Sequence, residues 1–269
     1  MINNVCDFHI HTCFSSDSDG DVRATIEKAV SLGMKHMAIT DHQDFGYPGN
    51  DFKLLPNINK YYDTLLSYKE EYKDKIDISI GCEVGLEADI PDTINDFVNL
   101  KPFDFIIGSS HLVHGIDIYY PEYYLNRSVE ESMVEYFESV LENLDACSNF
   151  DVYGHVDYIV RYCPGKNSEF SYEKYKDYLD KILTKIISMG KGIEINTGGF
   201  RAGLGEPNPC FDIISNYRKL GGKIITFGSD AHKPEDVGSY FDDAAALAKK
   251  SGFTEYYVYK NRKPIPVML

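Results

Sequence analysis

The chain of 269 residues has little positive charge: 27 lysine and arginine residues stand against 42 aspartate and glutamate residues, and the formal net charge is -15. Such a negative field repels nucleic acid and anionic membrane surfaces. A groove that follows a nucleic-acid backbone is lined by Lys and Arg. The composition therefore excludes nucleic acid and membranes as expected partners, and an anionic substrate would depend on metal ions or on single, well-placed arginines.

Long apolar runs are also missing. Nowhere is there an uninterrupted apolar stretch of about 18 residues, so the sequence predicts no membrane-spanning helix. The first residues, Met-Ile-Asn-Asn, have neither the basic start nor the apolar run of a signal peptide. We therefore expect a cytoplasmic protein.

The six cysteines have no Cys-x-x-Cys spacing, which argues against both a zinc ribbon and a disulfide framework. No linker, low-complexity tract or internal repeat divides the chain. A barrel of alternating strands and helices commonly has this length as one unit. We expect a single domain over residues 1–269.

Short β-rich apolar runs alternate with longer segments of helical period. The expected strands are residues 5–11, 36–40, 76–82, 103–108, 151–154, 192–196 and 224–228, with 255–259 as an eighth candidate. The expected helices are residues 22–33, 57–75, 129–147, 172–190, 209–221 and 241–252. This alternation is typical of βαβ units and predicts an α/β fold with a parallel sheet, either open or closed into a barrel.

Residues of the kind that carry chemistry follow the carboxyl ends of these runs. They are Asp41, His42, Glu83, His111, His155, Asp230 and His232. In parallel α/β barrels the active site is built from the loops at this end of the strands. We therefore expect all of these residues to lie together at the carboxyl-terminal opening of the barrel.

His9 and His11 add a pair on the first run. Alternate residues of a strand share a face, so the two imidazoles would lie roughly 6–7 Å apart and could share a metal ion, although two histidines packed in a core would give the same pattern. Histidine and carboxylate oxygen suit zinc, manganese and iron, and a carboxylate such as Glu83 can bridge two ions. The candidate ligands are too many for one metal.

These motifs resemble the polymerase and histidinol phosphatase (PHP) family, and specifically its histidinol-phosphatase branch. The matching pieces run from residue 7 to residue 238: Asp-Phe-His-Ile-His-Thr, Ile-Thr-Asp-His, Gly-Cys-Glu, Gly-Ser-Ser-His, Gly-His-Val-Asp and Gly-Ser-Asp-Ala-His-Lys-Pro. Arg161 and the stretch from Asn196 to Arg201 point to the branch.

The resemblance implies a distorted (β/α)7 TIM-like barrel with three divalent metal ions (Zn, Mn or Fe). Carried over by position, the ligands of the first ion are His9, His11, Glu83 and Asp230. Those of the second are Glu83, His111 and His155, and those of the third are Asp17, His42 and His232. Many family members have histidine where Asp17 stands, and Asp19 is a competing ligand.

Phosphate monoesters resist attack by water, and two ions about 3.5–4 Å apart lower the pKa of a bridging water toward 7, which makes a hydroxide nucleophile. Glu83 would be the bridge, and Asp17 or His42 is the candidate to protonate the leaving oxygen. Arg161 and Arg201 are expected to bind phosphate, since the planar guanidinium matches its geometry, although both could be surface arginines paired with carboxylates. Other candidates to line the pocket are Asn196, Glu206, Phe14, Tyr119, Tyr120 and Phe200.

The resemblance implies a metal-dependent phosphoric monoester hydrolase that acts on L-histidinol phosphate in histidine biosynthesis. A nucleoside monophosphate or another small phosphate ester is the alternative substrate. A third hypothesis, a structural metal site in a binding protein, is disfavoured because structural zinc sites usually take four Cys and His ligands, whereas this set is rich in carboxylate.

Overall fold

Seven strands within the described part of the computed structural model, residues 6–47, 49 and 51–269, form one curled sheet. The order is β1 (His36–Ile39), β3 (Asp77–Gly85), β4 (Phe105–Ser109), β7 (Val152–Tyr153), β8 (Gly192–Asn196) and β9 (Ile225–Gly228), while β2 (His42–Gln43) continues β1 and also pairs with β3. Every pairing in this sheet is parallel. Parallel sheets are covered on both faces, which is why these strands read as continuous apolar runs.

The segment 7–11 closes the sheet into a barrel. On one side Ala38 N donates to Asp7 O at 2.8 Å, and on the other side Phe8 N donates to Phe227 O at 2.8 Å. The segment thus lies between β1 and β9 and takes the place of one more parallel strand of the barrel. With this closure the predicted distorted (β/α)7 TIM-like barrel is confirmed.

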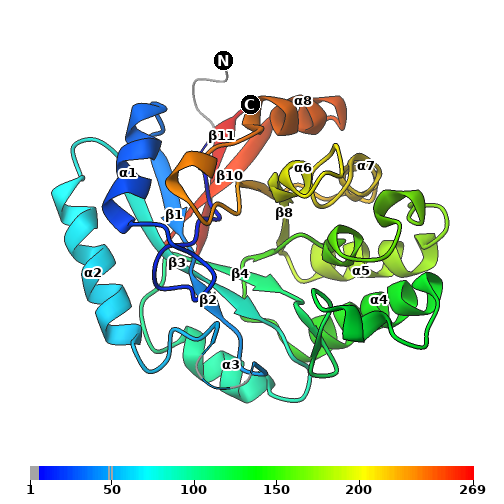
Figure 1. The fold of residues 1–269 in the computed structure, drawn as a ribbon. Helices are drawn as coiled ribbons and strands as arrows, with labels where there is room; N and C mark the ends of the chain where they lie inside the picture. Colours follow the sequence, from blue (N-terminus) through cyan, green and yellow to red (C-terminus); the bar gives the residue numbers. More distant parts are fainter. Residues whose placement is uncertain (1–5, 48, 50) are drawn as a thin grey trace.

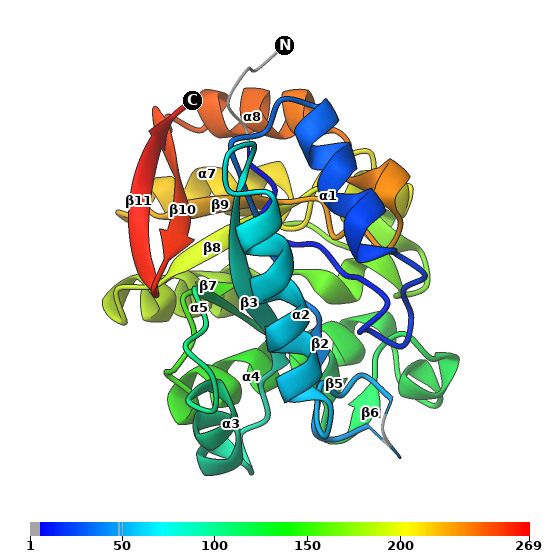
Figure 2. The same ribbon diagram turned by 90° about the vertical axis from the view of Figure 1, so that its left-hand side faces the viewer.

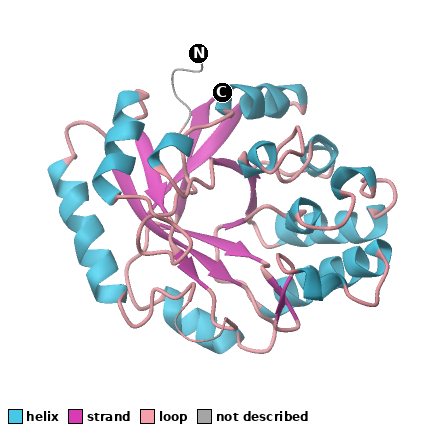
Figure 3. Ribbon diagram, viewed as in Figure 1, coloured by secondary structure: helices cyan, strands magenta, loops and turns pink. Residues whose placement is uncertain are grey.

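Helices surround the barrel on its outer side (Figures 1 and 3). They are α1 (Val22–Ser31), α2 (Ile58–Glu71), α3 (Pro91–Val98), α4 (Val129–Ala146), α5 (Lys176–Ser188), the short α6 (Gly198–Arg201), α7 (Phe211–Lys219) and α8 (Phe241–Lys250). α4 begins with a capping box, in which Ser128 and Glu131 satisfy each other's backbone N–H groups. The buried apolar side chains of strands and helices form one continuous core. Among the described residues, no helix has the length and apolar character needed to cross a membrane.

The amino-terminal end of the barrel is closed by the hairpin of β10 (Glu255–Lys260) and β11 (Lys263–Met268), drawn in red in Figure 2. Ser79 Oγ donates to Tyr259 O at 2.7 Å, and Arg262 Nε donates to Asp151 Oδ2 at 2.6 Å. Ser79 and Asp151 lie near the starts of their strands, so the hairpin covers the end opposite to the predicted carboxyl-terminal opening.

The structure differs from the sequence prediction in several elements. The eighth candidate strand, 255–259, is the antiparallel β10 and not a strand of the barrel. α3 and the small hairpin of β5 (Leu112–Val113) and β6 (Ile116–Asp117) were not expected, because these pieces are too short to give a clear period. Val5, part of the predicted strand 5–11, lies outside the described residues.

Candidate metal centre

All nine residues expected to hold metal ions meet at the carboxyl ends of the barrel strands. They come from segment 7–11, the loop after it, β2, β3 and the loops after β4, β7 and β9. His36, which is not among the candidate ligands, lies at the opposite end of the barrel, at the start of β1, where its Nδ1 is 3.6 Å from Asp77 Oδ2. The convergence that the barrel topology predicts is therefore present in the structure.

The first group consists of His9, His11, Glu83 and Asp230. The two Nε2 atoms of the histidines are 3.0 Å apart, and Glu83 Oε2 lies 3.1 Å from His9 Nε2 and 3.4 Å from His11 Nε2. Asp230 Oδ1 is 3.4 Å from His11 Nε2 and 3.7 Å from His9 Nε2. Four ligands bound tetrahedrally at about 2.0–2.1 Å lie about 3.3–3.4 Å from one another. The distances here, 3.0–3.7 Å, lie on both sides of this value.

The protonation of the two histidines supports a cation between them. His9 Nδ1 lies 2.6 Å from the carboxylate of Glu194, so it donates there and leaves Nε2 with a lone pair. Ser15 Oγ gives its proton to Asp41 at 2.7 Å, so His11 Nδ1 must be the donor in its 3.1 Å contact with Ser15. Two lone pairs then face each other at 3.0 Å, an arrangement that a metal ion or a proton stabilises.

The second group shares Glu83. Its other oxygen, Oε1, lies 2.9 Å from His155 Nε2 and 3.3 Å from His111 Nε2. One carboxylate thus directs its two oxygens to two sets of histidines, which is the geometry of a bridging ligand. His42 Nδ1 also lies 3.1 Å from Glu83 Oε2, and the trio of His42, Glu83 and His111 satisfies the spacing of a metal site.

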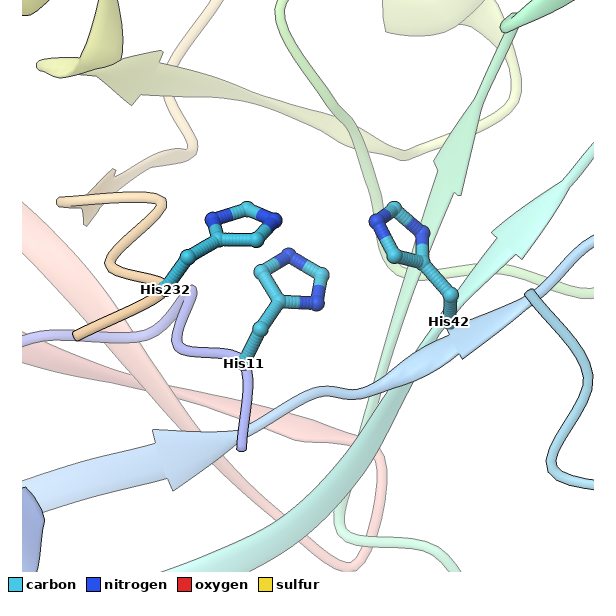
Figure 4. A group of neighbouring side chains, drawn as sticks. All are labelled: His11, His42 and His232. Atoms are coloured by element: carbon cyan, nitrogen blue, oxygen red, sulfur yellow. The ribbon is translucent and has the colours of Figure 1, made fainter. Parts of the chain in front are cut away.

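The third group lies farther out. Asp17 Oδ2 is 2.9 Å from His232 Nε2 and 3.7 Å from His42 Nε2. Figure 4 shows the imidazoles of His11, His42 and His232 converging from three separate segments. The ring of His11 stacks on both of the others, at 4.2 and 4.3 Å between centroids, and the three histidines also have metal-site spacing. Asp17, and not Asp19, makes these contacts.

Buried polar atoms without hydrogen bonds mark the cluster as suited to a cation. Among the described residues, Glu83 Oε2 and His42 Nδ1 make no hydrogen bond, although they lie 3.1 Å apart. A buried polar atom left without a partner costs about 1–3 kcal/mol. Divalent ions placed among these ligand atoms would satisfy both, so the residues present fit the metals that the sequence predicts.

The charges in the cluster reinforce one another. Burial acts to raise the pKa of the Glu83 carboxyl, but the neighbouring imidazoles of His9, His111 and His42 hold this pKa well below its ordinary value. Asp230 behaves in the same way, through His9 and Arg161. Both carboxyls are therefore ionised at neutral pH, the form that binds metals. Burial lowers the pKa of His155, which keeps this imidazole neutral and able to ligate.

Two buried carboxylates that orient the histidines were not among the predicted site residues. Asp44 Oδ1 lies 2.7 Å from His111 Nδ1, and Glu194 Oε1 lies 2.6 Å from His9 Nδ1. Carboxylates of this kind fix the ring orientation of a metal-binding histidine. A signal was present for Glu194, since it is the one charged residue of the apolar strand 192–196.

The two arginines occupy different positions. Arg161 is buried, which rules out the surface alternative for it, and it donates to Asp230 Oδ2 at 2.8 Å and to Asn196 and Asn208 at 2.7 Å each. Two of its five N–H groups remain outside these bonds. Arg201, in α6, donates through Nη2 to Asp230 O at 2.7 Å, while its Nη1 is buried and makes no hydrogen bond among the described residues.

A cavity of about 310 Å³ opens beside the cluster. His42, His111 and Asp17 line it on the metal side, and an acidic residue, Asp117, lines it with aromatic rings on the other. The rings are Tyr47, Phe52, Tyr119, Tyr120, Tyr158 and Tyr162.

The other residues expected to line this pocket lie elsewhere. Phe14 borders a separate cavity next to α2, and Phe200 stacks on Tyr240 at 5.0 Å. Glu206 accepts a hydrogen bond from Phe211 N. Asn196 contacts Arg161 and therefore lies behind Asp230.

Comparison with known proteins agrees with this geometry. The chain is 35% identical over 258 residues to the histidinol-phosphatase of Lactococcus lactis, which covers 96% of this chain and 95% of that one. It is 30% identical to a probable histidinol-phosphatase of Clostridium acetobutylicum, over 95% of this chain and 97% of the relative. A crystal structure of the Lactococcus lactis histidinol phosphate phosphatase, complexed with zinc, L-histidinol and phosphate, superposes with a TM-score of 0.88 at 33% identity and covers 97% of this chain and 98% of that chain.

The PHP domain model matches residues 7–198, a range that includes seven of the nine metal-ligand candidates, from His9 to His155. The match therefore contains the shared carboxylate, Glu83, and the histidines on both sides of it. The chain belongs to the PHP domain family.

Proposed function

We propose that the protein hydrolyses L-histidinol phosphate to L-histidinol and phosphate, with residues 1–269 acting as one PHP-type phosphatase domain. The observation that carries the proposal is the position of Glu83, whose two oxygens serve two sets of histidines beside a cavity that can hold a small organic group. The likeness to a phosphatase crystallised with zinc, L-histidinol and phosphate supports the choice of substrate.

We assign three divalent ions, of zinc, manganese or iron, to the three groups. His9, His11, Glu83 and Asp230 hold the first, Glu83, His111 and His155 the second, and Asp17, His42 and His232 the third. Divalent ions bound there supply charge neutralisation and a hydroxide nucleophile at neutral pH. The protein itself keeps the carboxyls of Glu83 and Asp230 ionised and the imidazole of His155 neutral, the forms that bind metals. It also holds the ligand atoms at the spacing described above.

The phosphoryl group is bound by arginine on the side of Asp230. The buried Nη1 of Arg201 is a free donor, and Arg161 has two N–H groups left after its bonds to the protein. The leaving oxygen then faces Asp17 and His42, which border the cavity. Asp17 is ionised and has no proton to give, so of the two candidates His42 is the one that can protonate the leaving oxygen, in competition with its place at the third ion.

The aromatic cavity receives the rest of the substrate. Histidinol carries an amine and an imidazole, both of which can be cationic, and cations are attracted to the faces of aromatic rings. Tyr119 and Tyr158 supply such faces, and the carboxylate of Asp117 adds negative charge at the same wall. A small, partly cationic phosphate ester fits this lining better than a polymer does. Location in the cytoplasm stays a prediction from the sequence.

A phosphate-release screen tests the proposal. We expect purified protein, loaded with zinc or manganese, to hydrolyse L-histidinol phosphate with a higher kcat/KM than AMP or a small aryl phosphate, and protein stripped with chelator to be inactive. An equal or higher kcat/KM for AMP would overturn the assignment of the substrate. Activity that survives removal of the metals would overturn the assignment of the reaction.

A further inference from the structure

One buried carboxylate, Glu194 of β8, contacts a proposed ligand of each of two metal ions. Its Oε1 lies 2.6 Å from His9 Nδ1, while its Oε2 accepts from the backbone N–H of His155 at 3.2 Å and from Asn196 Nδ2 at 3.1 Å. The residue is fully enclosed, with 1% of its surface exposed. It does not reach the cavity and is therefore not a group that touches substrate.

The neighbouring strand leaves space for this carboxylate. A Cβ added at Gly228 of β9 would lie 2.1 Å from Glu194 Oε1 and 2.4 Å from His9 Cβ. Any other residue at this position would push the carboxylate away from His9. The absence of a side chain at Gly228 thus allows the contact between Glu194 and His9.

His155 needs such support because of its backbone. Its φ angle is 22°, a positive value that is sparsely populated for residues other than glycine and that persists only when the surroundings impose it. The hydrogen bond from His155 N to Glu194 is one of the contacts that impose it.

We propose that Glu194 is a positioning residue that couples the first two metal sites. One oxygen fixes the tautomer of His9 so that Nε2 is free to bind, and the other holds the strained backbone of His155. This inference rests on the metal sites proposed above but not on the identity of the substrate. Asp44 is the matched comparison, because it contacts His111 of the second group at 2.7 Å and His42 of the third group at 3.4 Å. Within the described part of the chain it makes no hydrogen bond or ion pair with His9 or His11 of the first group.

Substitution by glutamine separates the two roles of Glu194. An amide has one acceptor oxygen. If that oxygen faces His9, the amide NH2 faces the N–H of His155, and if it faces His155, the NH2 donates to His9 Nδ1 and forces the proton onto Nε2. Glu194→Gln therefore preserves only one of the two contacts, whereas Glu194→Ala removes both.

The test measures metal binding directly. Wild type, Glu194→Ala, Glu194→Gln and the control Asp44→Ala are loaded, dialysed against graded chelator, and analysed for ions per chain. We expect Glu194→Ala to weaken the first and second ions by about 10–100-fold each, Glu194→Gln to weaken one of these two, and Asp44→Ala to leave the first ion as tightly bound as in wild type. Cobalt-substituted protein supplies a second readout, since its visible absorption bands report coordination geometry.

Circular dichroism of the metal-free proteins controls for folding. If Glu194→Ala does not fold, the near-isosteric Glu194→Gln serves as the test of the proposal. Loss of one ion from this variant, together with an altered cobalt spectrum, supports the proposal. Wild-type retention of all ions in Glu194→Gln overturns the proposal. So does loss of the first ion in Asp44→Ala, with the same cobalt spectrum as in Glu194→Ala. Failure of wild type to cleave histidinol phosphate would refute the proposed function but would leave this comparison of metal retention intact.

Discussion

The metal-ligand candidates divide into two regions that differ in burial. The inner region, His9, His11, Glu83, His111, His155 and Asp230, has side chains that are at most 10% exposed. In the outer region the side chains of Asp17 and His232 are 34% and 28% exposed, and that of His42, at the boundary with the inner region, is 11% exposed. Buried carboxylates orient His9 and His111 of the inner region.

The difference assigns different tasks to the two regions. An inner site held by oriented, buried ligands is preorganised, so it does not need to rearrange during each turnover. The outer side chains of Asp17 and His42 border the cavity, where substrate enters and product leaves. The inner region is therefore suited to making the nucleophile and the outer region to handling the substrate.

The strongest test of this comparison is Glu83→Gln. The neutral amide bridges two dications poorly, so we expect turnover to fall by several orders of magnitude while the protein still folds. Steady-state phosphate release and circular dichroism measure the two effects. A variant that keeps more than about a tenth of wild-type kcat would show that Glu83 does not bridge two ions.

An intermediate effect is expected from the two arginines. Truncation of either removes a charge-assisted contact worth roughly 1.5–3 kcal/mol, which corresponds to a loss of about ten- to a few hundred-fold in kcat/KM. Because Arg161 also binds Asp230 and Arg201 has a free Nη1, Arg161→Ala should lower the metal content and Arg201→Ala should not.

The controls for the arginines are lysine variants and a second substrate. Arg201→Lys should restore only part of the activity. The ammonium group of lysine attracts phosphate as a point charge but lacks the planar arrangement of N–H donors with which a guanidinium binds two phosphate oxygens. The loss should be the same for histidinol phosphate and for a small aryl phosphate. If Arg201→Ala impairs only histidinol phosphate, Arg201 contacts the leaving group and not the phosphoryl oxygens.

The smallest effect should come from Asp17→Asn, in the outer region. His232 and His42 lower the pKa of this carboxyl below its ordinary value, although burial opposes them, so Asp17 is ionised in the range where the enzyme works. Asparagine removes that charge. We expect the loss of at most one ion per chain and a partial loss of activity, with the inner ions retained on metal analysis. Loss of every ion would show that the two regions are not independent.

The convergence of the candidate ligands could be predicted from the sequence, whereas the residues that support them could not. His9, Glu83 and His155 could be found because each stands at the carboxyl end of an apolar run, and the topology of parallel strands brings such ends together. Glu194 could not be assigned a role in this way, since its contact with His9 spans 185 residues and depends on the register of β8 against the closing segment. The space at Gly228 is likewise a property of the packed strands.

The fold shows the same limit. Regular alternation was enough to predict the barrel, but the hairpin of β10 and β11 has no signal in that alternation. Its position at the amino-terminal end follows from contacts such as Arg262 with Asp151, which join residues far apart in the sequence. The local sequence pattern is enough to predict long, periodic helices and strands. The position of the β10–β11 hairpin, in contrast, depends on contacts with distant residues at the end of the barrel that it covers.

Closure of the barrel by the segment 7–11 sets an order of events at the ribosome. Asp7 accepts a hydrogen bond from Ser229 N, 222 residues later in the chain, and Asp230 follows directly. His9 and His11 therefore cannot complete the first site until the chain has been synthesised past Asp230. Contacts of such long range form late in folding because the loop between them must be closed first. A chain that ends before Asp230 has both histidines but lacks one ligand of the proposed first site, so we expect it to bind this ion poorly.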